Sequence, residues 1–339
     1  MFRKRAAVVL ALALAGCGGG GGGESRVLPP GGSLTYSPYV DVALTSPFDL
    51  AGVAPDAGAR SLTLAFVTAD GECNPSWGGR QAIDVASVAG PAARLRAAGV
   101  ALRVSFGGVQ GTELAHSCPT ASRLEAAYAS VLNQYHAVGA DFDLENASLA
   151  DRTALIRRDE ALAQLQARIG RPLAISLTVP VSPDGLSSAA LGTVRSMLAV
   201  GVRLHTINLL TMNYGGAFQG GMGAAAISAL LGTHRQLSSL GGGLGSWSAL
   251  GVTAMVGVND VSGEVFTLSD ARALAGFAAR HDLGLTSIWS LARDNPCQGS
   301  ESAADPTCSG VREPPYAFSR VFGARSATGL LPRRAVDTS

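Results

Sequence analysis

The sequence predicts a single (β/α)₈ barrel without a large insertion domain, and three observations support this prediction. The chain has 339 residues, 47% of them hydrophobic, which suffices for one barrel or for two ordinary domains. From residue 36 onward, eight short apolar runs rich in β-formers alternate with segments of helical periodicity. No change in composition divides this region, so we expect one continuous barrel.

The expected elements follow one another in a regular order. Strands are expected over residues 39–44, 62–67, 101–106, 140–145, 173–179, 206–212, 252–258 and 285–291. Helices are expected over residues 121–136, 152–169, 192–200, 224–240 and 268–281. A doubly wound open sheet is the alternative, but residues 43–48 lack the Gly-rich phosphate-binding turn that should follow its first strand.

The first 17 residues have the layout of an export signal. Arg3-Lys4-Arg5 precede an apolar run at residues 6–15 that is too short to span a bilayer. Leu14-Ala15-Gly16-Cys17 then resembles the lipobox of bacterial lipoproteins, whose cysteine is lipidated and becomes the mature N-terminus. This implies a protein exported to the bacterial cell envelope and lipid-anchored at the outer membrane or cell surface. An ordinary secretory signal is the alternative.

Residues 18–34 are Gly-rich and polar, which predicts a flexible tether that reaches about 20–25 Å as a random coil. The net charge of +1 and the 15% of charged residues argue against a nucleic-acid partner or a strongly charged one. We also expect a monomer that contacts the membrane only through its lipid.

Four cysteines remain after Cys17, and in an exported protein they indicate two disulfides. Their positions in the chain pair Cys73 with Cys118 and Cys297 with Cys308, each bond worth about 2–4 kcal/mol. A zinc site is the alternative, but the spacings lack a close cysteine pair or a histidine at ligand distance. The five histidines are scattered, and neither a metal nor a cofactor is expected.

Three acidic residues alternate with apolar ones near the middle of the chain. In a strand, Asp141, Asp143 and Glu145 would share one face, with Phe142 and Leu144 on the other. Such a row costs stability, but its mutual repulsion raises the pKa of the last acid to ionise. A solvated strand face and a calcium loop are alternatives; the loop would need Gly where Asn146 stands. We interpret the row as catalytic.

Other unusual residues also stand at the ends of expected strands. The third strand ends in Ser105-Phe106-Gly107-Gly108, the sixth in Met212-Asn213-Tyr214-Gly215, and the eighth carries Trp289. The active sites of (β/α)₈ barrels lie at the carboxyl ends of the strands. The sequence therefore predicts that these residues and the acidic row gather on one rim.

Together these motifs resemble the family 18 glycoside hydrolases, the chitinases and their relatives. The family's strand-four signature, Asp-Gly-x-Asp-x-Asp-x-Glu, aligns with residues 138–145; Ser-x-Gly-Gly, Met-x-Tyr and a strand-eight Trp also match. Residues 255–266 resemble a bacterial branch of these enzymes. The resemblance covers about residues 36–323, the catalytic barrel, and leaves residues 324–339 as a C-terminal tail. Val138 replaces the first acid of the signature, and Gly215 replaces the acid that usually follows the strand-six Tyr.

The resemblance implies retaining hydrolysis of β-1,4-linked N-acetylglucosamine, in which the acetamido oxygen of the substrate attacks the anomeric carbon. Glu145 would be the general acid and base, and Asp143 would orient the acetamido N–H. The negative charge of Asp141 would act on Asp143 and help to keep Glu145 protonated, or Asp141 would have only a structural role. Tyr214 would hold the acetamido carbonyl, with an ordinary core tyrosine as the alternative.

Trp289 would be the floor on which the sugar stacks, unless it is only barrel packing. Ser105, Gly107 and Gly108 are expected to shape the backbone and buttress the acidic row more than to touch sugar. Met212 is expected to contact the substrate, whereas Trp77 and Trp247 are weaker candidates for outer subsites and Asn213 and Asp260 are weaker still.

The short stretch between Val258 and Leu285 leaves no room for the α+β domain that walls the tunnel of processive relatives. We therefore expect an open groove and internal, non-processive cutting of chitin or chitooligosaccharides. Two rival functions remain: an endo-β-N-acetylglucosaminidase acting on glycans, and a non-catalytic surface protein that binds amino sugars. Glu145 and Asp143 argue against the second.

Overall fold

The structure, a computed structural model, describes residues 34–44, 50, 56–215, 220–241, 243–299 and 303–328. The expected signal peptide with Cys17, the tether up to residue 33 and the chain after residue 328 lie outside the described residues. Within the described ranges, no helix is both long enough and apolar enough to cross a bilayer.

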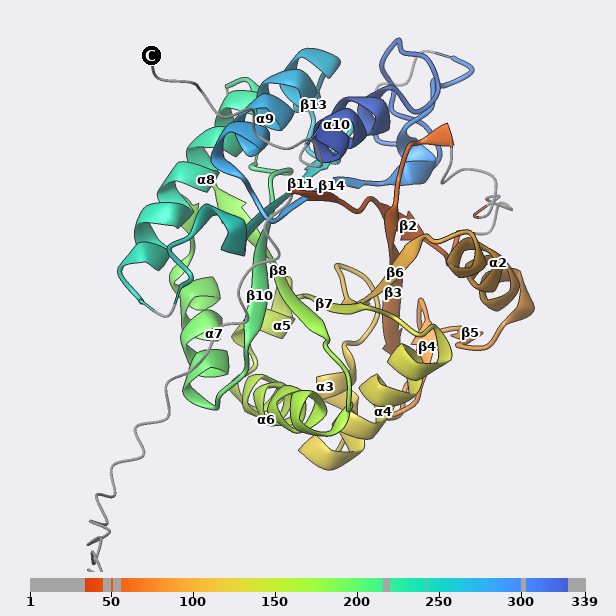
Figure 1. Cartoon of the computed structure of the whole chain (residues 1–339), viewed down its shortest axis with the longest axis vertical. Coiled ribbons are helices and arrows are strands. Elements are labelled where there is room, and N and C mark those ends of the chain that lie inside the picture. Colours follow the sequence, from red (N-terminus) through yellow and green to blue (C-terminus); the bar gives the residue numbers. More distant parts are fainter. Residues whose placement is uncertain are drawn as a thin grey trace, which may run out of the picture.

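Parallel strands form a closed ring, which Figure 1 shows from one end. Its members are β2 (Tyr39–Asp41), β3 (Ser61–Ala69), β6 (Ala101–Gly107), β7 (Gly139–Asp143), β8 (Ala174–Ser182), β10 (Leu204–Leu210), β11 (Leu250–Met255) and β14 (Leu285–Trp289). Each of these strands pairs in parallel with the next one along the chain. The expected barrel and its eight strand positions are confirmed.

The ring is closed by a first strand that is split in two. β1 (Thr35–Tyr36) pairs with β14, whereas β2 pairs with β3 on the other side. Thr35 is in register with Leu285, the first residue of β14. The described chain therefore begins at the amino-terminal end of the barrel, the end opposite the carboxyl rim.

Helices cover the outside of the ring (Figure 1). The long ones are α2 (Ala86–Ala97), α4 (Ala121–Gln134), α6 (Arg152–Arg168), α7 (Ser188–Ala199), α8 (Met222–Ser238), α9 (Leu268–His281) and α10 (Ala317–Thr328). The five expected helices are confirmed. α7 begins four residues before the expected start because the Ser187 hydroxyl accepts a hydrogen bond from the Ala190 N–H and caps the helix there. α10 continues past residue 323, where the tail is expected to start.

Shorter elements decorate the loops. They are β4 (Pro75–Trp77), β5 (Gln81–Ala82), α3 (Leu114–Ser117), α5 (Ala147–Ala150), β9 (Gly185–Leu186), η1 (Trp247–Ala249), β12 (Gly257–Val258), β13 (Val265–Phe266) and η2 (Leu291–Arg293). Between β11 and β14 there are only the β12–β13 hairpin and α9. The prediction of a barrel without a large insertion is thus confirmed.

Alternation along each strand separates an apolar outer layer from a polar barrel interior. On β7, Phe142 points outward and stacks on Phe106 with ring centroids 5.3 Å apart. The buried polar side chains on the strands include Arg103, Ser105, Asp141, Ser176, Thr178, Asn208, Thr253 and Ser287. Many barrels fill this space with branched apolar residues. Here the buried polar side chains of the interior need hydrogen-bond partners.

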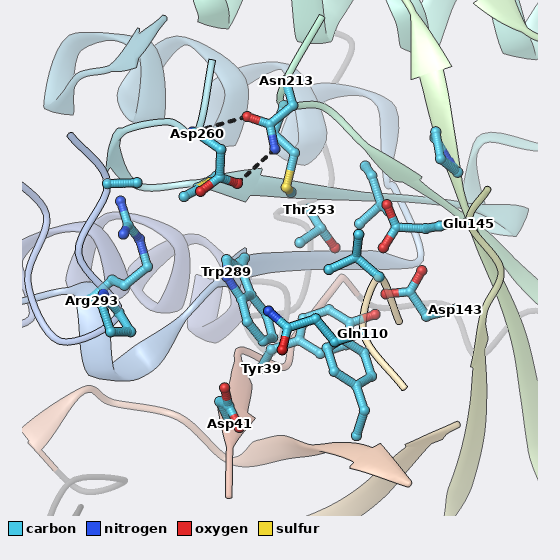
Figure 2. A pocket seen from close by; sticks show the side chains of 18 of the residues that line it. Tyr39, Asp41, Gln110, Asp143, Glu145, Asn213, Thr253, Asp260, Trp289 and Arg293 are labelled. Carbon is cyan, nitrogen blue, oxygen red and sulfur yellow. Dashed lines mark hydrogen bonds between the residues drawn. The ribbon is translucent and has the colours of Figure 1, made fainter. Parts of the chain in front are cut away.

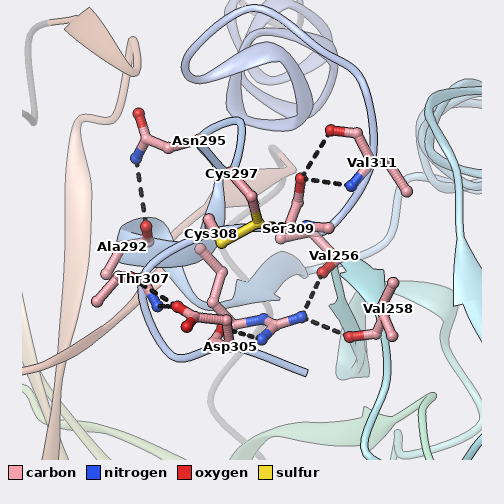
Figure 3. Close-up of a disulfide and its surroundings, with 12 residues drawn as sticks. Val256, Val258, Ala292, Asn295, Cys297, Asp305, Thr307, Cys308, Ser309 and Val311 are labelled. Atoms are coloured by element: carbon pink, nitrogen blue, oxygen red, sulfur yellow. Dashed lines mark hydrogen bonds between the residues drawn. A yellow bond between two sulfur atoms is a disulfide. The ribbon is translucent and has the colours of Figure 1, made fainter. Parts of the chain in front are cut away.

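Both expected disulfides are present. Cys73–Cys118 joins the segment after β3 to the end of α3, and Cys297–Cys308 closes a loop after η2, as Figure 3 shows.

Candidate active site

A cavity of about 520 Å³ opens at the carboxyl ends of the strands. Figure 2 shows Asp143 and Glu145 beside each other on its wall, with their carboxylates directed inward. β7 ends at Asp143, and Glu145 lies two residues further along, half-buried. The expected gathering of residues on one rim is therefore observed for the two outer acids.

Asp141 lies one strand step deeper and does not line the cavity. Its carboxylate accepts hydrogen bonds from four hydroxyl groups at 2.6–2.8 Å, those of Tyr39, Ser105, Ser176 and Thr178. These donors come from the strands on both sides of β7 and from β2. All the acceptor capacity of Asp141 is thus used inside the barrel, which suits the structural role considered for it.

Asp143 is 2% exposed, and no described group hydrogen-bonds its Oδ1 atom. Burial raises the pKa of Asp143 well above its ordinary value, and the charges of Glu145 and Asp141 add to the effect. Burial also raises the pKa of Glu145, and there the charged neighbour that contributes is Asp260. Desolvation is therefore the first cause at both acids, whereas the sequence had suggested mutual repulsion.

This raised pKa leads to a prediction about stability. Because folding raises the pKa of Asp143, its ionisation opposes folding, and stability is lost as pH rises from about 3.9 towards the folded value. Asp143→Asn removes that cost, so we expect its Tm at pH 7 to exceed the parent's by about 1–4 °C. Thermal unfolding at several pH values checks this: the difference should vanish near pH 3, and a lower Tm at pH 7 would contradict it.

Ser105, Gly107 and Gly108 support the acids from β6. The Gly108 N–H donates to the Asp143 carbonyl at 2.9 Å, and the Ser105 hydroxyl donates to Asp141 at 2.7 Å. A Cβ on Gly107 would lie 2.2 Å from the Asp143 carbonyl oxygen, and one on Gly108 would lie 2.8 Å from the Phe66 ring. None of the three lines the cavity, which fits the expected buttressing role, and a direct contact with substrate stays a prediction.

Trp289 and Met212 do line the cavity, as expected. The half-buried indole of Trp289 stacks on Phe66, with ring centroids 5.3 Å apart and planes 22° apart. No sequence motif marks Phe66, whose place beside Trp289 follows from closure of the ring between β14 and β3. The cavity therefore has a flat aromatic surface of the kind on which sugar rings stack.

Asn213 and Asp260 form a reciprocal pair at the cavity edge (Figure 2). The Asn213 amide donates to the Asp260 carboxylate at 2.9 Å and accepts from the Asp260 N–H at 3.1 Å. Asn213 has a left-handed backbone, with φ +54°. These contacts fix the carboxylate whose charge helps to raise the pKa of Glu145.

Tyr214 is half-buried and packs against the core, and it is not among the residues that line the cavity. Its N–H and that of Gly215 donate to the Glu264 carboxylate at 3.0 and 2.9 Å. Burial, with the charge of Glu264 second, raises the pKa of the Tyr214 phenol. Its contact with an acetamido carbonyl stays a prediction.

The two tryptophans suggested for outer subsites lie elsewhere, and those assignments are wrong. Trp77 is fully buried, because β4 pairs with β3 and its indole N–H donates to the Tyr135 hydroxyl. Trp247 precedes β11, at the amino-terminal end of the barrel, where it stacks on His234 with centroids 3.9 Å apart.

One wall of the cavity has no counterpart among the sequence motifs. Arg293, Ala304, Asp305 and Pro306 line it, and the Cys297–Cys308 disulfide closes the loop that carries the last three (Figure 3). The Arg293 guanidinium donates to the carbonyls of Val256 and Val258 and to that of Asp305. It therefore ties this loop to the end of β11.

No family model matches the chain. It is 34% identical over 303 residues to a probable bifunctional chitinase/lysozyme of Escherichia coli (strain K12), covering 85% of this chain and 34% of that protein. It is 34% identical over 278 residues to endochitinase 11 of Metarhizium anisopliae, covering 77% of this chain and 52% of that protein. The chain thus spans about a third and about half of the length of these two relatives.

Solved structures show the same likeness. The catalytic domain of a hyperthermophilic chitinase from Pyrococcus furiosus superposes with a TM-score of 0.79 at 28% identity, covering 92% of this chain and 100% of that one. A putative chitinase A from Streptomyces coelicolor, at 17% identity and a TM-score of 0.61 over 87% of this chain and 99% of that one, shares the fold.

Proposed function

We propose that the chain is a family 18 chitinase that hydrolyses β-1,4-linked N-acetylglucosamine in chitin or chitooligosaccharides, and its likeness to chitinases supports this. The observation that supports this most directly is the pairing of Glu145 with the buried Asp143 on the wall of a cavity floored by Trp289. A carboxylic acid with a raised pKa beside a stacking surface for sugars is what glycosidic cleavage needs.

The proposed mechanism assigns each step to an atom. Glu145 donates its proton to the glycosidic oxygen while the acetamido oxygen of the substrate attacks the anomeric carbon and the glycosidic bond breaks. Water then attacks the same carbon, Glu145 takes up one proton of this water, and the acetamido group is released with retention of configuration. Burial and the charge of Asp260 raise the pKa of Glu145, which favours the protonated form that the first step needs.

Asp143 would act on the acetamido group. Its Oδ1 atom has no hydrogen-bond partner among the described residues, so it can accept the acetamido N–H. Its carboxylate would also stabilise the positive charge of the oxazolinium intermediate. The hydroxyl groups around Asp141 leave that deeper carboxylate no capacity for substrate, so it acts on Asp143 only through its negative charge.

We further propose internal cutting. Only a short hairpin and α9 lie between β11 and β14, so no additional domain walls this side of the cavity. A long chain of chitin can therefore enter sideways, and we expect mixed oligosaccharides early in its digestion. Chromatography of products at low conversion checks this, and dimers alone would contradict it.

Three substrates separate the candidate functions. Turnover of a chromogenic chitobioside and of chitin, without release of N-glycans, supports the chitinase. The reverse preference would indicate an endo-β-N-acetylglucosaminidase, and binding without turnover would indicate a non-catalytic amino-sugar-binding protein. Glu145→Gln is the control for contaminating activity.

We also propose that Cys17 carries a lipid that holds a monomer at the bacterial envelope. The resemblance of residues 14–17 to a lipobox supports this. In the producing cell, the Cys17→Ser variant should no longer incorporate labelled lipid. Labelling that persists in this variant would contradict the anchor.

A further inference from the structure

A buried cation lies beneath the acidic row. Arg103 is on β6, two residues before Ser105, and only 8% of its surface is exposed. It is in register with Gly139, the first residue of β7, and the acids follow further along that strand. Arg103 therefore occupies the layer of the barrel interior below Asp141.

Gly139 makes room for the guanidinium. A Cβ at this position would lie 2.7 Å from Arg103 Nη1 and 2.9 Å from its Cζ. The guanidinium therefore lies directly against the backbone of β7. Any other residue at position 139 would push the cation away from the strand that carries the acids.

Hydrogen bonds connect this cation to the row. Arg103 Nη2 donates to the Ser176 hydroxyl at 2.7 Å, and that hydroxyl donates to Asp141 Oδ1 at 2.6 Å. The serine thus accepts from the cation and donates to the anion, so the two charges are one hydroxyl apart. Within the described ranges Arg103 forms no direct salt bridge with an acid.

We propose that Arg103 is a positioning residue that offsets the charge of Asp141 and thereby sets the pH range in which Asp143 and Glu145 share the catalytic proton. The inference rests on the proposed hydrolysis and adds the residue that tunes it. Arg103 does not line the cavity, so it acts only through the field and the hydrogen bonds that it supplies.

The other ionisable groups near the cation fit this role. Tyr39 and Asp141 lie on the side of the row, and His205 lies beside Arg103 from β10. Burial, with the charge of Arg103 second, lowers the pKa of His205, so this histidine adds no competing positive charge at neutral pH. Arg103 is thus the cation that faces the acids from below.

The sign of the effect follows from electrostatics. Removing a positive charge makes the potential at Asp143 and Glu145 more negative, which favours proton binding and raises both apparent pKa values. Removing one buried unit charge from the layer below Asp141 is expected to raise each of these pKa values by about 1 unit. Both limbs of the profile of kcat/KM against pH should then move to higher pH.

The test compares pH profiles of the full chain with chitobioside as substrate. We expect Arg103→Met to move both limbs upward by about 1 pH unit. Arg103→Lys keeps the charge, so its limbs should move by no more than half as much. Ser176→Ala breaks the bridge but keeps the cation, so it should cause a smaller shift. Arg94→Met, at an exposed position on α2, removes the same charge from the surface and should leave the profile unchanged.

Two outcomes would overturn the proposal: an unshifted profile in Arg103→Met, or equal shifts in the Met and Lys variants, which would show a merely structural role. If Arg103→Met does not fold, Ser176→Ala decides, and an unshifted profile in that variant would overturn the proposal. Titration of ¹³C-labelled carboxyl groups follows the same pKa values without substrate. An inactive parent would therefore refute the proposed hydrolysis while the tuning by Arg103 remained measurable.

Discussion

Glu145→Gln is expected to lower kcat on a chromogenic chitobioside by about 10²–10⁴-fold, the usual contribution of a general acid and base. Glutamine has nearly the shape of glutamic acid but no proton to give to the leaving oxygen. The half-buried side chain would keep its place on the cavity wall, so KM should change little. Steady-state kinetics at the pH optimum measures both constants.

Glu160→Gln is the matched control for this substitution, because it makes the same chemical change at an exposed position on α6. It should leave kcat within twofold of the parent. A Glu145→Gln enzyme that retained more than a tenth of the parental kcat would show that another group delivers the proton.

Gly107→Ala is expected to damage both the fold and the site. The backbone at Gly107 has φ +100°, and a Cβ there would lie 2.2 Å from the Asp143 carbonyl oxygen, so β6 and β7 would have to separate. We expect the free energy of unfolding to fall by about 3–5 kcal/mol. The hydrogen bond from the Gly108 N–H to the same oxygen would be strained, so kcat should fall at least tenfold.

Gly99→Ala separates the clash from the backbone conformation. Gly99 also has a positive φ, +83°, but a Cβ there would meet nothing within 4 Å. It should therefore cost only the conformational penalty, about 1–2 kcal/mol, with unchanged kcat. Denaturant unfolding of both variants gives the comparison, and equal losses would refute the role of the close approach.

Local patterns in the sequence were enough to predict the ring and the two outer acids. Alternation along residues 139–145 placed Asp143 and Glu145 on one side of β7, and the strand ends brought Met212 and Trp289 to the same rim. Such features depend on parity and order, which the chain carries locally.

Features that depend on register between strands could not be predicted in the same way. Asp141 receives its hydroxyl donors because it is aligned with Ser105 on one side and with Ser176 on the other. Serines are common, and nothing in the local sequence distinguishes these two. The cation beneath them was missed for the same reason, because its contacts cross three strands.

The errors also have physical causes. The residues around Trp77 have the composition of a loop, but a short antiparallel pairing with β3 buries the indole. Trp247 directly precedes a strand, and its place at the amino-terminal end could have been deduced from that order alone. The wall at Arg293 depends on how the disulfide-closed loop folds back, for which no motif exists.

The split first strand has a consequence for how the molecule can be mounted on a support. Since Thr35 is level with the first residue of β14, an attachment made at Thr35 would lie at the amino-terminal end of the barrel, opposite the cavity. A bead or a lipid surface attached at that point would face the amino-terminal end, with the mouth of the cavity turned outward. Insoluble polymer could then reach the mouth unhindered, whereas fixation through the loops after the strands would cover it.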